Sequence, residues 1–181
     1  METKPSHQKR PTSLAIYLLL AFGITWLVWI PALVIADSQG YTLPTIANFN
    51  QVLQAGFADW QHVLLSIMFS LAVYGPLVGG LVATRIDSGK EGLADLFQRM
   101  IKWQVEIKWY TFALGIAIVI PLTPRLIAEL AGQMTPLAGD ALGWSLPLLA
   151  GVFLWQFVTS GLGEEPGWRG YLLPRFQSRH G

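Results

Sequence analysis

The sequence contains no cysteine, and only 13% of its 181 residues are charged. The first absence excludes disulfide bonds, thiolate metal ligands and cysteine nucleophiles. The low charge, together with 52% hydrophobic residues and a mean hydropathy of +0.45, excludes an ordinary soluble domain. The net charge of +1 arises from interleaved acids and bases without a long basic stripe, so we expect no nucleic-acid partner. The class that remains is a membrane protein, with the lipid bilayer as its first partner.

Four stretches are long and apolar enough to cross a hydrocarbon core of about 30 Å, which takes about 20 helical residues. They are Ser13 to Ala36, Gln61 to Thr84, Trp109 to Ala131 and Leu142 to Leu162. Continuous apolar runs predict helices, because the strands of a membrane barrel alternate apolar and polar residues. We therefore expect an all-α, polytopic membrane protein with a polar tail at 1–12 and a single membrane domain at 13–181.

Lysine and arginine are missing from two of the predicted loops, 37–60 and 132–141. The N-terminal tail, the loop 85–108 and the C-terminal segment contain nearly all of the basic residues. By the positive-inside rule, both termini and the loop 85–108 are cytoplasmic, and the location is expected to be a bacterial plasma membrane. Arg125 is the exception, and we interpret it as a snorkelling charge or one paired with Glu129, four residues further on.

The loop 85–108 predicts an amphipathic helix, because Leu93, Leu96, Phe97 and Met100 recur at spacings of three and four. We expect this helix to lie along the cytoplasmic membrane surface. Glycine and proline inside the predicted spans are interpreted as kinks and close helix contacts. The residues concerned are Gly75, Pro76, Gly79, Gly80, Pro121, Pro124 and Pro147.

Two carboxylates and a guanidinium follow the fourth predicted span, in the stretch GEEPGWRGY at 163–171. On a continuous helix Glu165 and Arg169 share a face, and Glu164 is rotated away by about 100°. We expect Arg169 to neutralise Glu165 and to leave Glu164 without a local partner. A half-buried carboxylate of this kind suits a general base that acts on water. The plainer alternative, interfacial charges that mark a helix end, remains open.

The string EEPGWRGYLLPRFQ, which begins at Glu164, resembles the first signature, Glu-Glu-x-x-x-Arg, of the CPBP family. This family of intramembrane metalloproteases includes the type II CAAX prenyl endopeptidases and the bacteriocin-processing and immunity (Abi) proteins, and the similarity extends upstream to Tyr74. The resemblance implies a metalloendopeptidase that cleaves a peptide bond near the membrane. It assigns Glu164 to activating water and Glu165 with Arg169 to supporting the site, with zinc assisting.

The chain departs from the family pattern in its histidines. Family members carry later Phe-x-x-x-His and His-x-x-x-Asn motifs, and catalytic zinc takes about three protein ligands. Only His7, His62 and His180 are present. His7 lies in the polar tail, His62 is expected about 30 Å from the motif by helix rise, and His180 is interpreted as a loop residue although Phe176 precedes it by four. We therefore expect a truncated member, the N-terminal part of the domain, which lacks metal ligands and does not cleave peptides alone.

Two other functions remain open on the sequence. The charged cluster could hold helices together in a non-catalytic membrane immunity or scaffold protein. It could also form an ion or proton path in a transporter or channel fragment.

Overall fold

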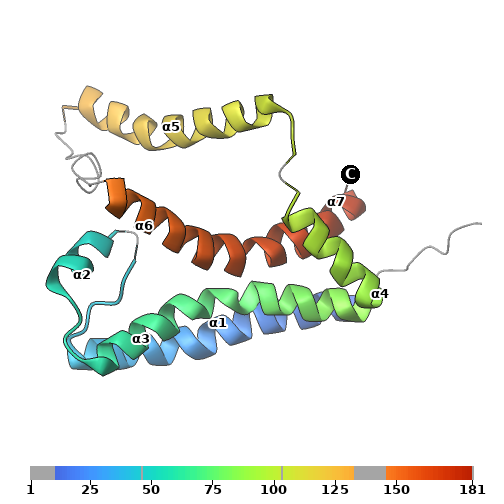
Figure 1. Ribbon diagram of the computed structural model, residues 1–181, viewed down its shortest axis with the longest axis horizontal. Coiled ribbons are helices and arrows are strands. Elements are labelled where there is room, and N and C mark those ends of the chain that lie inside the picture. Colours follow the sequence, from blue (N-terminus) through green and yellow to red (C-terminus); the bar gives the residue numbers. More distant parts are fainter. Residues whose placement is uncertain (1–10, 46, 103, 133–145, 181) are drawn as a thin grey trace, which may run out of the picture. The chain divides into compact units, whose positions relative to one another are not determined.

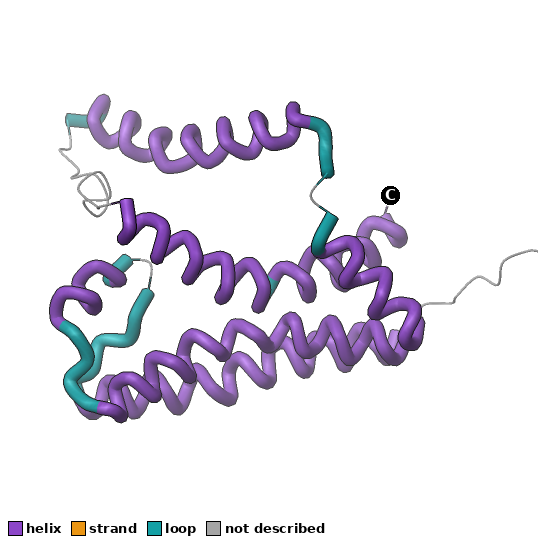
Figure 2. The backbone as a smooth tube through the Cα atoms, in the orientation of Figure 1, coloured by secondary structure: helices purple, strands orange, loops and turns teal. Residues whose placement is uncertain are grey.

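The structure is a computed structural model that describes residues 11–45, 47–102, 104–132 and 146–180. Within these ranges every regular element is a helix (Figures 1 and 2), so the all-α prediction is confirmed. Three of the described helical segments are long and apolar enough to cross a membrane, and the bent pair Leu146–Gly161 and Pro166–Ser178 makes a fourth if it is one span. The chain divides into two compact units, one of Met1–Ile101 with Val152–Gly181 and one of Lys102–Gly151.

The first unit is built on the long helix α1 (Pro11–Gln39), which lies alongside α3 (Trp60–Leu71) and α4 (Gly75–Met100) in Figure 1. Glycine allows this close approach, because a Cβ atom added to Gly79 would lie 2.8 Å from the carbonyl oxygen of Tyr17. The other face of α1 is apolar and exposed, as at Leu27, whose exposed fraction is 77%. Such a face is suited to lipid.

A 3₁₀ turn, η1 (Ala72–Tyr74), joins α3 to α4 and reflects the proline that follows it. Pro76 has no N–H group, so the carbonyl of Ala72, four residues earlier, loses its helical donor. The Thr25 hydroxyl of α1 donates a hydrogen bond to that carbonyl over 2.9 Å. The N–H group of Gly75 donates to the same carbonyl, as a 3₁₀ turn requires, and the helical run continues from Trp60 to Met100.

α4 continues past Thr84, where the second predicted span ends, and turns sharply at Gly89. The φ of 64° and ψ of −151° at Gly89 form a backbone conformation that essentially only glycine adopts. The charged residues at 85–88 ended the predicted span, but charge alone does not interrupt helical hydrogen bonds. The turn directs the predicted amphipathic segment back toward the rest of the unit, where Leu96 is 1% exposed. Phe97, in contrast, remains about half exposed.

Of the other described helices, two correspond to the third and fourth predicted spans and one lies in a predicted loop. α5 (Ile107–Leu130), in the second unit, matches the third predicted span, and α6 (Leu146–Gln156) lies inside the fourth. The predicted loop 37–60 contains an additional short helix, α2 (Phe49–Ala55). The tail at 1–10, the residues 142–145 and the side chain of Arg125 lie outside what the structure describes.

Candidate functional site

Glu164 and Glu165 lie where the helical chain widens and bends. α6 passes into a π-helix, η3 (Phe157–Gly161), and a second π-helix, η4 (Pro166–Leu172), precedes α7 (Leu173–His180). The segments on the two sides of the carboxylates are bent by 40°. The wide turns of a π-helix disturb the regular hydrogen bonding of the backbone. Within η3, the carbonyl of Val158 accepts a hydrogen bond from the Tyr74 hydroxyl over 2.7 Å. The carboxylates therefore occupy a break between two helical segments of a bent pair.

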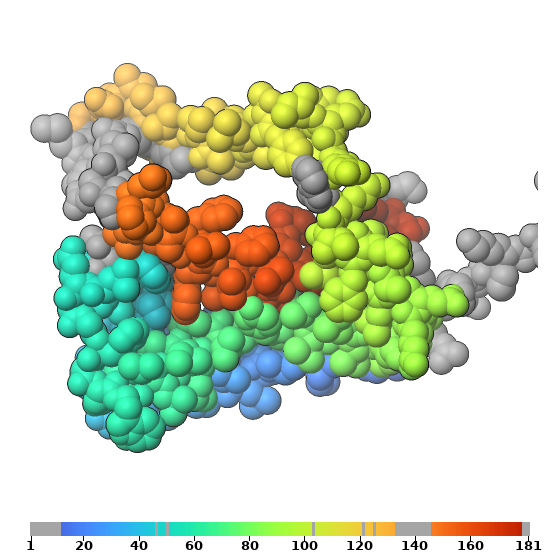
Figure 3. Space-filling model, viewed as in Figure 1, coloured from blue at the N-terminus to red at the C-terminus, as the bar shows by residue number. Residues whose placement is uncertain are grey.

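This break packs against the middle of the helical run formed by α3, η1 and α4. A Cβ atom added to Gly163 would lie 3.0 Å from a methyl carbon of Val73, near the centre of the predicted span 61–84. In Figure 3 the red surface of the C-terminal motif segment lies against the green surface of α4.

Two glycines of the motif and one glycine of α4 allow this close contact. A Cβ atom on Gly167 would overlap the carbonyl of Pro76, and one on Gly80 would lie 3.1 Å from the Cα atom of Gly167. A Cβ atom on Gly170 would lie 2.6 Å from Leu96, on the part of α4 that follows its turn. The predicted close helix contacts are confirmed for Gly80, and Leu96 packs against the motif segment.

Glu165 forms an ion pair with Arg169, one helical turn further on. The spacing of four residues predicted this pair. The side chains of Glu165 and Arg169 are 42% and 73% exposed in the protein, so water screens the pair unless lipid or a partner covers it. Arg169 therefore balances the negative charge of Glu165 locally.

Glu164 is half-buried and, among the ion pairs of the described residues, takes part in none. The expectation that it has no local partner is wrong, because the side chain of Ser160, one turn earlier, is hydrogen-bonded to it. Its backbone carbonyl accepts hydrogen bonds from the N–H groups of Gly167 and Trp168, at 3.1 and 3.0 Å. The Ser160 hydroxyl therefore bonds the Glu164 carboxylate, and the backbone of Glu164 is fixed by its two hydrogen bonds. Among the described residues, no cation pairs with the carboxylate.

A second charged cluster, which the sequence did not predict, joins α4 to η4 and α7. Asp87 accepts hydrogen bonds from Arg175 over 2.5 Å and from the Tyr171 hydroxyl over 3.2 Å. The side chains of Asp87 and Arg175 are only 5% and 19% exposed, and the guanidinium lies 3.5 Å from the centroid of the Tyr171 ring. Tyr171 and Arg175 are four residues apart, which the sequence shows. Asp87 is 88 residues from Arg175, and no local signal connects them.

Among the described side chains, His62 is the one histidine, and its ring is engaged by backbone groups away from Glu164. His62 lies 11 residues before Val73, a helix rise of about 16 Å, and Val73 in turn lies against Gly163 of the motif. Both of its ring nitrogens are within hydrogen-bond distance of backbone groups, at 3.2 Å from Ala58 and 2.9 Å from Thr42. His180 is the last residue of α7 and not a loop residue, because no breaker precedes Gly181. The His180 side chain and all of His7 lie outside the described residues.

The described residues do not form a set of metal ligands. In the part of the chain that the structure describes, no three His, Cys, Asp or Glu side chains lie together as metal ligands do. Glu165 is already engaged by Arg169, and the nitrogens of His62 are engaged by the backbone. The described residues therefore do not fit the zinc that the family resemblance implies.

Comparison with protein-family models, curated proteins and solved structures finds no match for this chain. The resemblance of its Glu-Glu-x-x-x-Arg motif to the CPBP family stays a prediction that rests on the motif itself.

Proposed function

We propose that the chain is a polytopic membrane protein that carries the water-activating part of an intramembrane endopeptidase site, as in the CPBP family. Glu164 is the general base that takes a proton from the attacking water, and Glu165 with Arg169 shapes the site beside it. The observation that supports this most is the unequal environment of the two adjacent carboxylates. One is balanced by an arginine, and the other is half-buried with only a hydroxyl partner.

The position of the carboxylates supports a site inside the membrane. The break that carries Glu164 packs beside Val73, midway along a stretch apolar enough to span a bilayer. Ionisable residues at such depth are costly and are found mainly at functional sites. No step of the proposal passes through a metal ion, and we expect the chain alone not to cleave peptides.

A hydrophobic carbodiimide tests the difference between the two carboxylates, because it reacts with a protonated carboxyl group. We expect mass spectrometry of the liposome-reconstituted chain to find the label on Glu164 and not on Glu165. Glu164→Gln should lose the label, and Arg169→Gln should make Glu165 reactive as well. Equal labelling of both carboxylates in the wild type would favour the non-catalytic scaffold.

A cleavage assay tests the chemistry. The wild type and the Glu164→Gln and Glu165→Gln variants are mixed in liposomes with a fluorogenic transmembrane peptide, with and without added zinc. We expect no cleavage by the wild-type chain alone. Zinc-dependent cleavage that Glu164→Gln abolishes would support the role of Glu164 and overturn the expected inactivity. Cleavage that survives Glu164→Gln would contradict the proposed base.

A further inference from the structure

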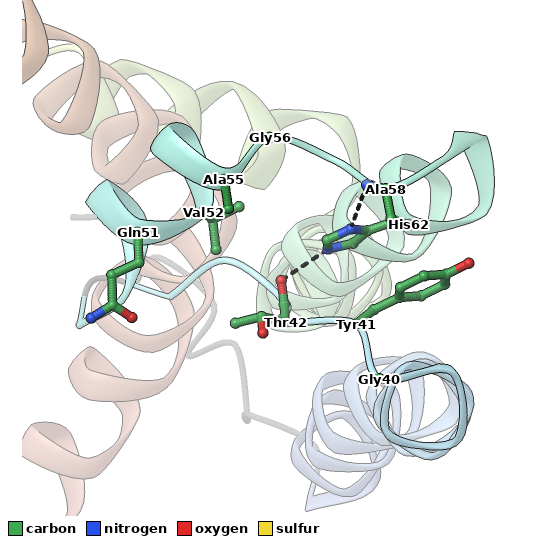
Figure 4. Close-up of a pocket in the computed structure, with 9 residues that line it drawn as sticks. All are labelled: Gly40, Tyr41, Thr42, Gln51, Val52, Ala55, Gly56, Ala58 and His62. Atoms are coloured by element: carbon green, nitrogen blue, oxygen red, sulfur yellow. Dashed lines mark hydrogen bonds between the residues drawn. The ribbon is translucent and has the colours of Figure 1, made fainter.

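A cavity of about 320 Å³ lies between the connection that follows α1, the short helix α2 and the start of α3 (Figure 4). The described residues that line it include no lysine, arginine, aspartate or glutamate. They are Gly40, Tyr41, Thr42, Gln51, Val52, Ala55, Gly56, Ala58 and His62. In the proposed topology this cavity belongs to the side of the membrane opposite the basic loops.

His62 holds together the segments that enclose this cavity. Its ring is buried, and Figure 4 shows hydrogen bonds from its two nitrogens to two different connections. Nδ1 lies 3.2 Å from the backbone nitrogen of Ala58, and Nε2 lies 2.9 Å from the carbonyl oxygen of Thr42. A carbonyl oxygen only accepts and an amide N–H only donates, so Nε2 carries the hydrogen and Nδ1 is the acceptor. The observed bonds therefore require a neutral ring in one tautomer.

We propose that His62 is a proton-operated latch whose protonation releases the connection between α2 and α3 and opens the cavity. A proton from water that binds Nδ1 places a hydrogen on that nitrogen, facing the N–H of Ala58. Two donors then oppose each other, and Ala58 loses its acceptor. The bond to Thr42 survives, so the side that opens is the connection at 56–59.

Two other titratable groups face His62, and neither replaces the lost acceptor. Tyr41 stacks on the ring with centroids 4.7 Å apart, and its hydroxyl donates to Asp59. Asp59 also accepts from the backbone N–H of His62 over 2.9 Å. The Tyr41 hydroxyl and that N–H hold the pKa of Asp59 below its usual range, so Asp59 stays ionised in mildly acidic solution. Its attraction for a charged ring opposes release, but the carboxylate is exposed and water screens it.

The sequence around His62 contains little other charge that would oppose release of the connection between α2 and α3. Residues 37–62 contain no lysine or arginine, and Asp37 is their only acid besides Asp59. His62 is also the only histidine of this stretch.

Hydrogen exchange of the reconstituted full chain tests the latch. We expect the protection factor of the Ala58 amide, corrected for the intrinsic pH dependence of exchange, to fall on the order of tenfold between about pH 7.5 and 5. His62→Asn places a non-titrating oxygen near the position of Nδ1 and should show no such fall. Asp59→Asn should keep it. A fall of equal size in His62→Asn, or its loss in Asp59→Asn, would overturn the proposal.

A second measurement leaves His62 unchanged, so its result does not depend on whether the His62→Asn variant folds. In a chain with His7→Gln and His180→Gln, the NMR signals of the imidazole ring report His62 alone. We expect the ring titration and the loss of Ala58 protection to share one midpoint. A ring that titrates while Ala58 stays protected would show that His62 is not a latch.

Discussion

Replacing Asp87 by asparagine removes the carboxylate that joins α4 to η4 and α7. The substitution keeps the size of the side chain but leaves the guanidinium of Arg175 without its counter-charge. Breaking a buried ion pair in this way costs about 3 to 5 kcal/mol. Because 19% of the Arg175 side chain stays exposed and partly solvated, we expect a loss of about 3 kcal/mol in the free energy of unfolding.

The matched control is Asp95→Asn, the same substitution on the same helix. Asp95 pairs with Arg99 over 3.0 Å, but these side chains are 66% and 47% exposed. An exposed pair of this kind contributes at most about 1 kcal/mol. The difference in burial alone thus predicts that Asp87→Asn is the more damaging substitution by at least about 2 kcal/mol.

Equilibrium unfolding by SDS in mixed micelles measures both variants through the fluorescence of the eight tryptophans. The double variant Asp87→Asn with Arg175→Gln should lose less stability than Asp87→Asn alone, because it leaves no uncompensated buried charge. An Asp87→Asn variant that is as stable as Asp95→Asn would refute the view that this cluster anchors the motif segment.

Three further predictions concern packing, acid and topology. Gly167→Ala should cost about 1 to 3 kcal/mol in the same titration, because its methyl group overlaps a backbone carbonyl of α4, whereas Gly151→Ala meets open space and should cost nothing; equal losses would contradict the close contact. The lowered pKa of Asp59 adds stability that is present above its unfolded value of about 3.8 and is lost as the pH falls through the lower folded value, so Asp59→Asn should flatten the acid dependence of hydrogen exchange at the start of α3 below that pH. Because the chain has no cysteine, an impermeant maleimide should label Ala55→Cys in intact cells and Gln177→Cys only after permeabilisation; labelling of both in intact cells would refute the topology.

Much of the fold could be predicted from local patterns. Apolar runs of helical length gave α5 almost to the residue, and the spacing of four gave the pair Glu165–Arg169. The second predicted span stops at Thr84, where charged residues begin, whereas the helix α4 continues and turns at Gly89. The partner of Glu164 was also missed, although Ser160 lies one turn before it, because a serine in an apolar run gives no sign of where its hydroxyl points.

The sequence by itself determined the all-helical class, the apolar segments and the local pairing within the motif, because each depends on residues within a few turns of one another. Only the tertiary structure decided that Asp87 reaches Arg175, that Leu96 covers Gly170 and that Gly163, next to Glu164, lies beside Val73. These contacts join residues that are far apart along the chain, and the turn at Gly89 and the missing side chains at Gly80 and Gly167 bring them together. The physical reason is that helix packing depends on which surfaces fit closely, and that fit belongs to pairs of helices and not to either one alone.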